Sequence, residues 1–103
     1  MFTVRLFCAA GMSTSLLVTN LRKAARGRGM EADIEAYPID TMAKNLTAAD
    51  VVLLGPQVAY MKRKAAKLCE EAGIPMSLIP MAIYGKMDGE KVLDFALELA
   101  SGN

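Results

Sequence analysis

Short apolar strand patterns alternate with amphipathic helix patterns along the whole of this 103-residue chain. This alternation constrains the fold, because helices that connect parallel strands cover both faces of the sheet that those strands form. The expected strands are residues 3–8, 32–37, 50–54 and 76–79. The expected helices are residues 12–26, residues 58–72 and a last helix capped by Asp88, with a weaker helical pattern around residues 42–46. A chain of this length builds one core, so residues 1–103 are expected to form a single α/β domain.

The strands are predicted to lie in the order 2-1-3-4 in a three-layer, open parallel sheet of four strands. Residues 32–37 alternate between apolar and polar side chains, as is typical of an edge strand. Residues 50–54, Asp-Val-Val-Leu-Leu, are apolar on both faces and indicate a central strand. Right-handed crossovers then favour this strand order. In such a sheet, ligands bind between the carboxyl ends of strands 1 and 3, where the chain crosses from one side to the other.

Residues 6–17, Leu-Phe-Cys-Ala-Ala-Gly-Met-Ser-Thr-Ser-Leu-Leu, carry the clearest chemical signal. Cys8 ends the first expected strand, and a loop of small and flexible residues leads directly into the first helix. Backbone N–H groups of such a loop can converge on the sulfur, and the helix N-terminus favours an anion there. The sequence therefore predicts a phosphate-binding loop with the nucleophile Cys8 at its edge. The expected loop residues are Ala9, Ala10, Gly11, Met12, Ser13, Thr14 and Ser15.

Three further residues border the expected site. Gln57 and Tyr60 follow the third strand, so they either line the crevice or simply begin the next helix. Tyr84 follows the fourth strand and either faces the site or packs in the core, of which packing is favoured. Cys69, inside the second long helix, is interpreted as a packing residue, because most cysteines outside special loops are buried and inert.

The composition excludes several classes of function. Twelve basic against eleven acidic residues give no concentrated positive surface for nucleic acid. No apolar run approaches the ~20 residues needed to span a bilayer, and the first residues lack the pattern of a signal peptide, so a cytoplasmic protein is expected. The two cysteines form no C-x-x-C motif, and we expect neither a metal nor a cofactor. The chain has no histidine, which excludes a Cys–His or Ser–His pair of its own.

A run of basic residues on the second long helix has two interpretations. It is a solvated helix face, or it contacts an acidic partner. The run comprises Lys62, Arg63, Lys64 and Lys67.

Three segments carry a family resemblance: residues 6–17, residues 50–61 (Asp-Val-Val-Leu-Leu-Gly-Pro-Gln-Val-Ala-Tyr-Met) and residues 83–89 (Ile-Tyr-Gly-Lys-Met-Asp-Gly). In this order and spacing they resemble the IIB component of the lactose/cellobiose class of the bacterial phosphoenolpyruvate:sugar phosphotransferase system. The resemblance covers nearly the whole chain. It implies a flavodoxin-like sheet, similar to the phosphatase P-loop fold, and a cytoplasmic phosphocarrier that needs no cofactor and is monomeric when isolated.

The resemblance also implies partners and a route for the phosphoryl group. Cys8 would accept the group from a phosphohistidine of the IIA component and donate it to a sugar bound by the membrane component IIC. The chain would be recruited to the inner face of the membrane through IIC. The sugar would be a β-linked disaccharide such as cellobiose, chitobiose or lactose, and the histidine that this chain lacks would belong to the partner.

Two other classes of protein are alternatives to this carrier. Low-molecular-weight tyrosine phosphatases combine a similar sheet with a C-x5-R loop whose arginine binds the transition-state phosphate. Here the sixth residue after Cys8 is Thr14, and no Asp-Pro pair can supply a general acid, which disfavours a phosphatase. A regulatory domain whose phosphorylation state is read by a partner is the second alternative, and the sequence does not distinguish it from a carrier.

Overall fold

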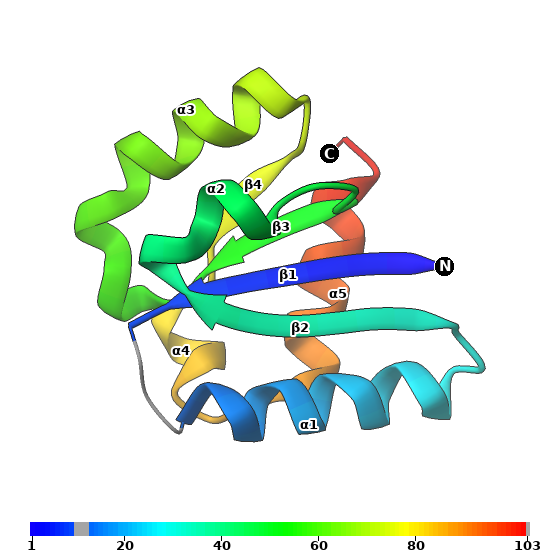
Figure 1. The fold of residues 1–103 in the computed structure, drawn as a ribbon. Helices are drawn as coiled ribbons and strands as arrows, with labels where there is room; N and C mark the ends of the chain where they lie inside the picture. The colour runs from blue at the N-terminus through cyan, green and yellow to red at the C-terminus, as the bar shows by residue number, and fades with distance from the viewer. Residues whose placement is uncertain (10–12, 103) are drawn as a thin grey trace.

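The computed structural model describes residues 1–9 and 13–102, with the side chains of Ser13 and Thr14 left out. Within these residues, four parallel strands form one sheet in the order β2-β1-β3-β4 (Figure 1). This order and the parallel pairing confirm the prediction. The strands are β1 (Phe2–Cys8), β2 (Ala32–Pro38), β3 (Val51–Leu54) and β4 (Met76–Leu78).

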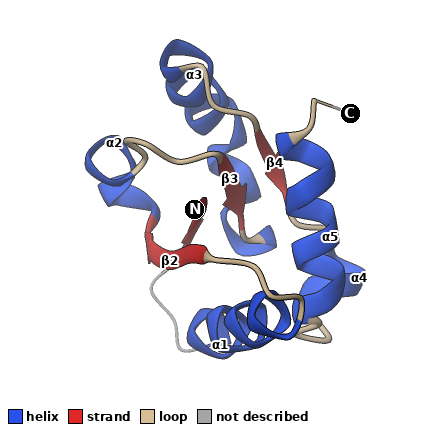
Figure 2. Ribbon diagram, turned by 90° about the vertical axis from the view of Figure 1, so that its right-hand side faces the viewer, coloured by secondary structure: helices blue, strands red, loops and turns tan. Residues whose placement is uncertain are grey.

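Helices cover both faces of the sheet, which Figure 2 shows nearly end on. The helix α1 and the last helix, α5, pack on one face, whereas α2 and α3 pack on the other. The three-layer arrangement is therefore also as predicted. The helical segments are α1 (Ser13–Gly27), η1 (Ile39–Thr41), α2 (Met42–Asn45), η2 (Pro56–Met61), α3 (Lys62–Ala72), α4 (Met81–Tyr84) and α5 (Gly89–Ala100), where η marks a 3-10 helix.

The two inner strands bury side chains on both faces. Successive side chains of a strand point to opposite sides, and β3 is entirely buried, with each of its residues 0% exposed. Leu6 and Leu53 pack into the core with α1 and α5, whereas Phe7 and Leu54 pack into the core with α2 and α3. The apolar run in the sequence thus corresponds to a strand covered on both sides.

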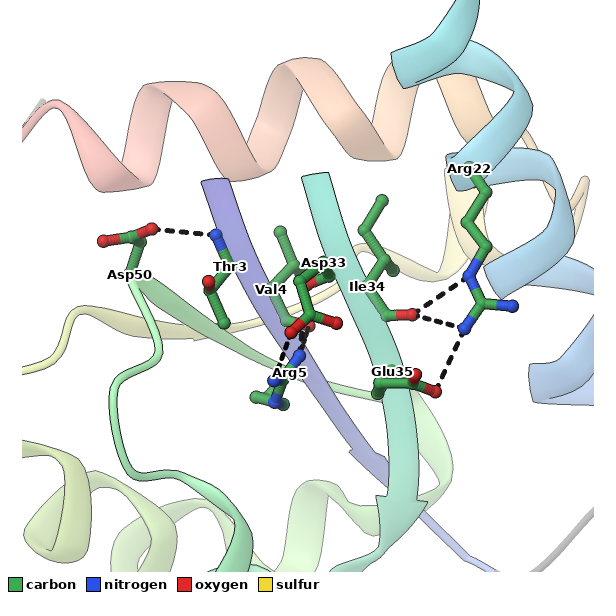
Figure 3. A network of polar contacts seen from close by, with 8 residues as sticks. All are labelled: Thr3, Val4, Arg5, Arg22, Asp33, Ile34, Glu35 and Asp50. Carbon is green, nitrogen blue, oxygen red and sulfur yellow. Dashed lines mark hydrogen bonds and ion pairs between the residues drawn. The ribbon is translucent and has the colours of Figure 1, made fainter. Parts of the chain in front are cut away.

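Polar contacts fix the outer strand β2 to its neighbours (Figure 3). Arg5, on β1, bonds to the carboxylate of Asp33 at 2.9 Å and to the backbone oxygen of the same residue at 3.1 Å. The hydrogen bond from this guanidinium holds the pKa of the Asp33 carboxyl below its usual range. On the other side, Arg22 of α1 donates to the backbone oxygen of Ile34 at 2.7 Å and to Glu35 at 3.0 Å. Charged side chains therefore anchor this edge strand.

The opposite edge of the sheet is short. The strand β4 has three residues and lies between Pro75 and Pro80. It pairs with β3 from Val52↔Met76 to Leu54↔Leu78. Proline has no backbone N–H to donate to a further strand, so neither flank of β4 extends the edge.

The helix expected over residues 58–72 has a different beginning. The 3-10 helix η2 comes first, and Val58 within it has non-helical angles (φ −110°, ψ 25°). Pro56 fixes the first turn, and Val58 turns inward to complete burial, which interrupts the regular helix before Lys62. The other end is as expected, because Gly73 adopts a left-handed conformation (φ 72°) that ends α3.

Helices α1 and α5 approach closely where α5 begins. Asp88 caps α5 by accepting a hydrogen bond from the backbone N–H of Lys91 at 3.1 Å. The next residue, Gly89, is buried, and a β-carbon on it would overlap the backbone carbonyl group of Asn20. Asn20 also donates its side-chain amide to the backbone oxygen of Met87 at 2.8 Å. The close contact between the helices thus depends on Gly89 having no side chain.

We predict that Gly89→Ala destabilises the protein by about 1–3 kcal/mol, because the added methyl group forces two backbones apart. Urea unfolding monitored by circular dichroism measures this change. The matched control is Gly27→Ala at the end of α1, where nothing lies within 4 Å of the added carbon. Gly27→Ala is expected to be neutral or slightly stabilising. Equal unfolding midpoints for the two variants would contradict the close contact.

Candidate functional site

The predicted site lies where the carboxyl ends of β1 and β3 meet, at the side of the sheet to which the arrows point in Figure 1. Cys8 is the last residue of β1 and is 5% exposed. The backbone N–H of Gly55, the first residue after β3, donates to the backbone oxygen of Phe7 at 2.9 Å. This bond brings the segment after β3 directly beside the cysteine.

The described residues include part of the predicted phosphate-binding loop. Ala9 is exposed after Cys8, and Ser15 is exposed in the first turn of α1. Ala10, Gly11 and Met12, together with the side chains of Ser13 and Thr14, lie outside the described residues. The role of the loop in binding an anion therefore stays a prediction. The described part places the start of α1 after the carboxyl end of β1, as that prediction requires.

Gln57 and Tyr84 lie together. The side-chain Nε2 of Gln57, in η2, donates to the hydroxyl of Tyr84 at 2.6 Å. Tyr84, the last residue of α4, is 6% exposed and packs in the core with α1 and α5, so the expectation that it packs is confirmed. Its hydroxyl nevertheless reaches the segment that borders Cys8. Tyr84 therefore packs in the core with its ring and also contacts the edge of the site with its hydroxyl.

Gly55 brings the Gln57 side chain close to Cys8. A β-carbon built on Gly55 would overlap Oε1 of Gln57 and would lie 3.2 Å from Cβ of Cys8. The amide and the cysteine therefore flank the same methyl-sized space. The sequence predicts that Gly55 follows the third strand at the crevice, but not that its missing side chain makes room for Gln57. A glycine directly after a buried central strand was the available signal, because such a residue permits close approach of neighbouring groups.

Tyr60 has a different environment from Gln57. It is 78% exposed, and the large apolar side chains of Leu16 and Met81 are also exposed, by 53% and 65%. These residues belong to the segments that directly follow β3, β1 and β4, respectively. Exposed apolar groups therefore surround the carboxyl edge of the sheet at which Cys8 lies, a distribution that is typical of a contact surface.

An apolar groove separates η1 and α2 from α3 on one face of the molecule. Asp40 and Lys64 contribute opposite charges to its lining, whereas Lys62 and Arg63 are exposed at the start of α3. Cys8 does not line this groove. The basic residues are thus exposed as the sequence indicates. Lys64 is in contact with solvent and also lines the groove.

Cys69 confirms its interpretation as a packing residue. It is 1% exposed and lies among the apolar side chains between the sheet and α3. Burial raises the pKa of its thiol to about 11. The neutral thiol is therefore the form present at physiological pH, which makes this residue a poor nucleophile.

Residues 1–9 and 13–102 contain no group of three or more His, Cys, Asp or Glu side chains arranged to hold a metal ion. Among the helices in the same residues, none combines the length and the apolar character needed to cross a membrane.

Comparisons with known proteins agree with this geometry. Residues 3–95 match the family described as "PTS system, Lactose/Cellobiose specific IIB subunit". A cellobiose-specific EIIB component from Lactococcus lactis subsp. lactis and a galactose-specific EIIB component from Lactococcus lactis subsp. cremoris are each 50% identical over 101 residues, which cover 93% of this chain and 94% of the relative. The solution structure of a cellobiose-specific phosphotransferase IIB component from Borrelia burgdorferi has a TM-score of 0.82 and 37% identity, covering 98% of this chain and 93% of that chain.

We predict that Cys69 resists alkylation while the protein is folded. In a Cys8→Ser variant, iodoacetamide at pH 8 should modify Cys69 about 100-fold more slowly than a cysteine of ordinary pKa, because the reactive thiolate is scarce below pH 11. The rate should rise with pH and should reach the ordinary value when urea unfolds the protein. Mass spectrometry measures the modification. Equal rates in the folded and unfolded protein would show that burial does not protect this thiol.

Proposed function

Because this chain belongs to the lactose/cellobiose-specific IIB family of the phosphotransferase system, we propose that Cys8 is the residue on which it carries a phosphoryl group. As a IIB component, the protein is a sugar phosphotransferase of that system. The observation that carries the proposal is the position of Cys8 at the carboxyl end of β1, beside the segment that follows β3. Ligands of open parallel sheets bind at this point.

The transfer balances with a phosphohistidine as donor. The Cys8 thiolate attacks phosphorus, an S–P bond forms, and the P–N bond breaks with its electron pair remaining on the imidazole of the IIA component. In the second transfer, a hydroxyl group of the sugar bound by IIC loses its proton to water as its oxygen forms a bond to phosphorus. The S–P bond breaks with its electron pair remaining on sulfur, and the thiolate is restored. The chain itself contains no histidine, which is consistent with a donor histidine on the partner.

The loop after Cys8 is the proposed binding site for the oxygens of the phosphoryl group. Ala9 to Ser15 offer backbone N–H groups and hydroxyls ahead of α1, and neutral donors of this kind bind an anion without a fixed cation. A carrier has to accept the group and release it again. Donors of moderate strength suit this requirement better than a bound metal or an arginine.

The surface around Cys8 is the proposed contact for both protein partners. Leu16, Tyr60 and Met81 supply exposed apolar groups, and Lys62 and Arg63 add positive charge beside them. An apolar centre with charged residues near its edge suits a transient interface with an acidic partner. We place the protein in the cytoplasm, as a monomer that IIC recruits to the inner face of the membrane.

The substrate class follows from the family and not from the site. We propose a β-linked disaccharide such as cellobiose, chitobiose or lactose. Two equally similar relatives are named for different sugars, cellobiose and galactose. Overall identity therefore does not select one sugar.

The test is phosphorylation with phosphoenolpyruvate, the general phosphotransferase proteins and a candidate IIA component. The wild-type protein should gain one phosphoryl group on Cys8, because Cys69 is buried within the core. Cys8→Ser should abolish transfer to sugar, whereas the matched variant Cys69→Ser should retain it. Mass spectrometry locates the group. Phosphorylation of another residue, or equal loss of transfer in both variants, would overturn the assignment of Cys8.

A further inference from the structure

Tyr84 connects the core to the segment beside Cys8. The ring is buried among the side chains that pack between the sheet, α1 and α5. Its hydroxyl accepts the short hydrogen bond of 2.6 Å from Gln57. Because a buried ring has little freedom to move, the oxygen offers a fixed point on which an otherwise mobile glutamine side chain is held.

The orientation of Gln57 follows from this bond and from Gly55. The nitrogen of its amide, Nε2, is held by the Tyr84 hydroxyl. The oxygen, Oε1, lies against Gly55, on the side where Cβ of Cys8 is also close. The residue as a whole is exposed. A group that binds to the Cys8 sulfur from solvent therefore enters the immediate surroundings of a positioned amide.

The amide has the chemistry needed for such a group. Its nitrogen carries two hydrogen atoms, of which one bonds to the Tyr84 hydroxyl. Because the amide is planar, the hydrogen cis to Oε1 points to the same side as Oε1, which is the side of Cys8. This N–H reaches a phosphoryl oxygen there when the trans hydrogen bonds to Tyr84. A hydrogen bond from a neutral amide to a charged phosphoryl oxygen is stronger than one between neutral groups. The amide does not ionise at physiological pH, so the strength of this hydrogen bond does not depend on the charge state of Gln57.

We propose that Gln57 donates a hydrogen bond to the phosphoryl group while that group is on Cys8, and that Tyr84 is the positioning residue for Gln57. This inference rests on the proposed function and adds to it two side chains outside the loop. As the S–P bond forms and the P–N bond breaks, Gln57 neither gives nor takes a proton. It stabilises negative charge on the phosphoryl oxygens, and Tyr84 acts only through the geometry of Gln57.

The experiment measures the rate of phosphoryl transfer from a phosphorylated IIA protein to this chain under single-turnover conditions. Gln57→Ala should lower the maximal rate about tenfold or more, with the half-saturating IIA concentration unchanged. Gln57→Glu should lower the rate at least as far, because a carboxylate repels the phosphoryl group. Tyr84→Phe should lower it about three- to tenfold. The double variant should be no slower than Gln57→Ala alone, since Tyr84 acts through Gln57.

Two controls separate this role from general damage. Tyr37→Phe also removes one hydroxyl from a partly buried tyrosine, but that hydroxyl bonds to no described residue, so its transfer rate should match the wild type. Alkylation of Cys8 by iodoacetamide, measured in a Cys69→Ser background, should change less than twofold in Gln57→Ala. This is expected because the Gln57 amide, which the variant removes, acts on the phosphoryl group and not on the thiol itself.

The outcomes are distinguishable. If wild type accepts a phosphoryl group on Cys8 but Gln57→Ala and Gln57→Glu transfer it within twofold of the wild-type rate, the inference is wrong and the proposed function stands. A loss confined to the half-saturating concentration makes Gln57 a docking contact and also overturns the inference. An equal loss of transfer and of Cys8 alkylation indicates a displaced cysteine and overturns it as well. If wild type gains no phosphoryl group on Cys8, the proposed function itself fails.

Discussion

The two inner strands, β1 and β3, are buried between helices on both faces, and the position of every candidate site residue depends on this burial. Each residue of β3 is 0% exposed, and complete burial of a valine or leucine side chain stabilises a fold by about 1.5–3 kcal/mol. The register of these strands is therefore strongly determined, because a shift by one residue would exchange the two cores. The same register brings the end of β1 beside Gly55.

The three-layer arrangement also gives the two cysteines different positions in the fold. Cys69 lies within a layer, between α3 and the sheet, where burial raises the pKa of its thiol. Cys8 lies at the end of a strand, where the layers stop and loops begin. A nucleophile is useful only at such an edge, since a partner has to reach it. Position in the topology, more than residue type, separates the packing cysteine from the proposed carrier.

Local pattern was sufficient to predict most of the fold. The alternation in residues 32–37 and the uniform apolar character of residues 50–54 determined the strand order, because both reflect which faces are covered. The predicted beginning of the second long helix, at residue 58, was wrong, since burial of Val58 within η2 outweighs the helical periodicity. The bond between Gln57 and Tyr84 was beyond prediction. It joins η2 and α4 through residues that are 27 positions apart, and it depends on the tertiary arrangement of these two elements, which the local sequence of neither one determines.

The two outer strands have a consequence for a protein that exchanges partners. An open sheet exposes unpaired backbone groups at its edges, and such edges associate readily with other strands. Here β4 is only three residues long between two prolines, and β2 carries ion-paired charges. Backbone pairing with another protein is thereby disfavoured at both edges. The proposed contact surface instead consists of side chains at the carboxyl end of the sheet, so release of a partner from it requires no paired strand to be separated.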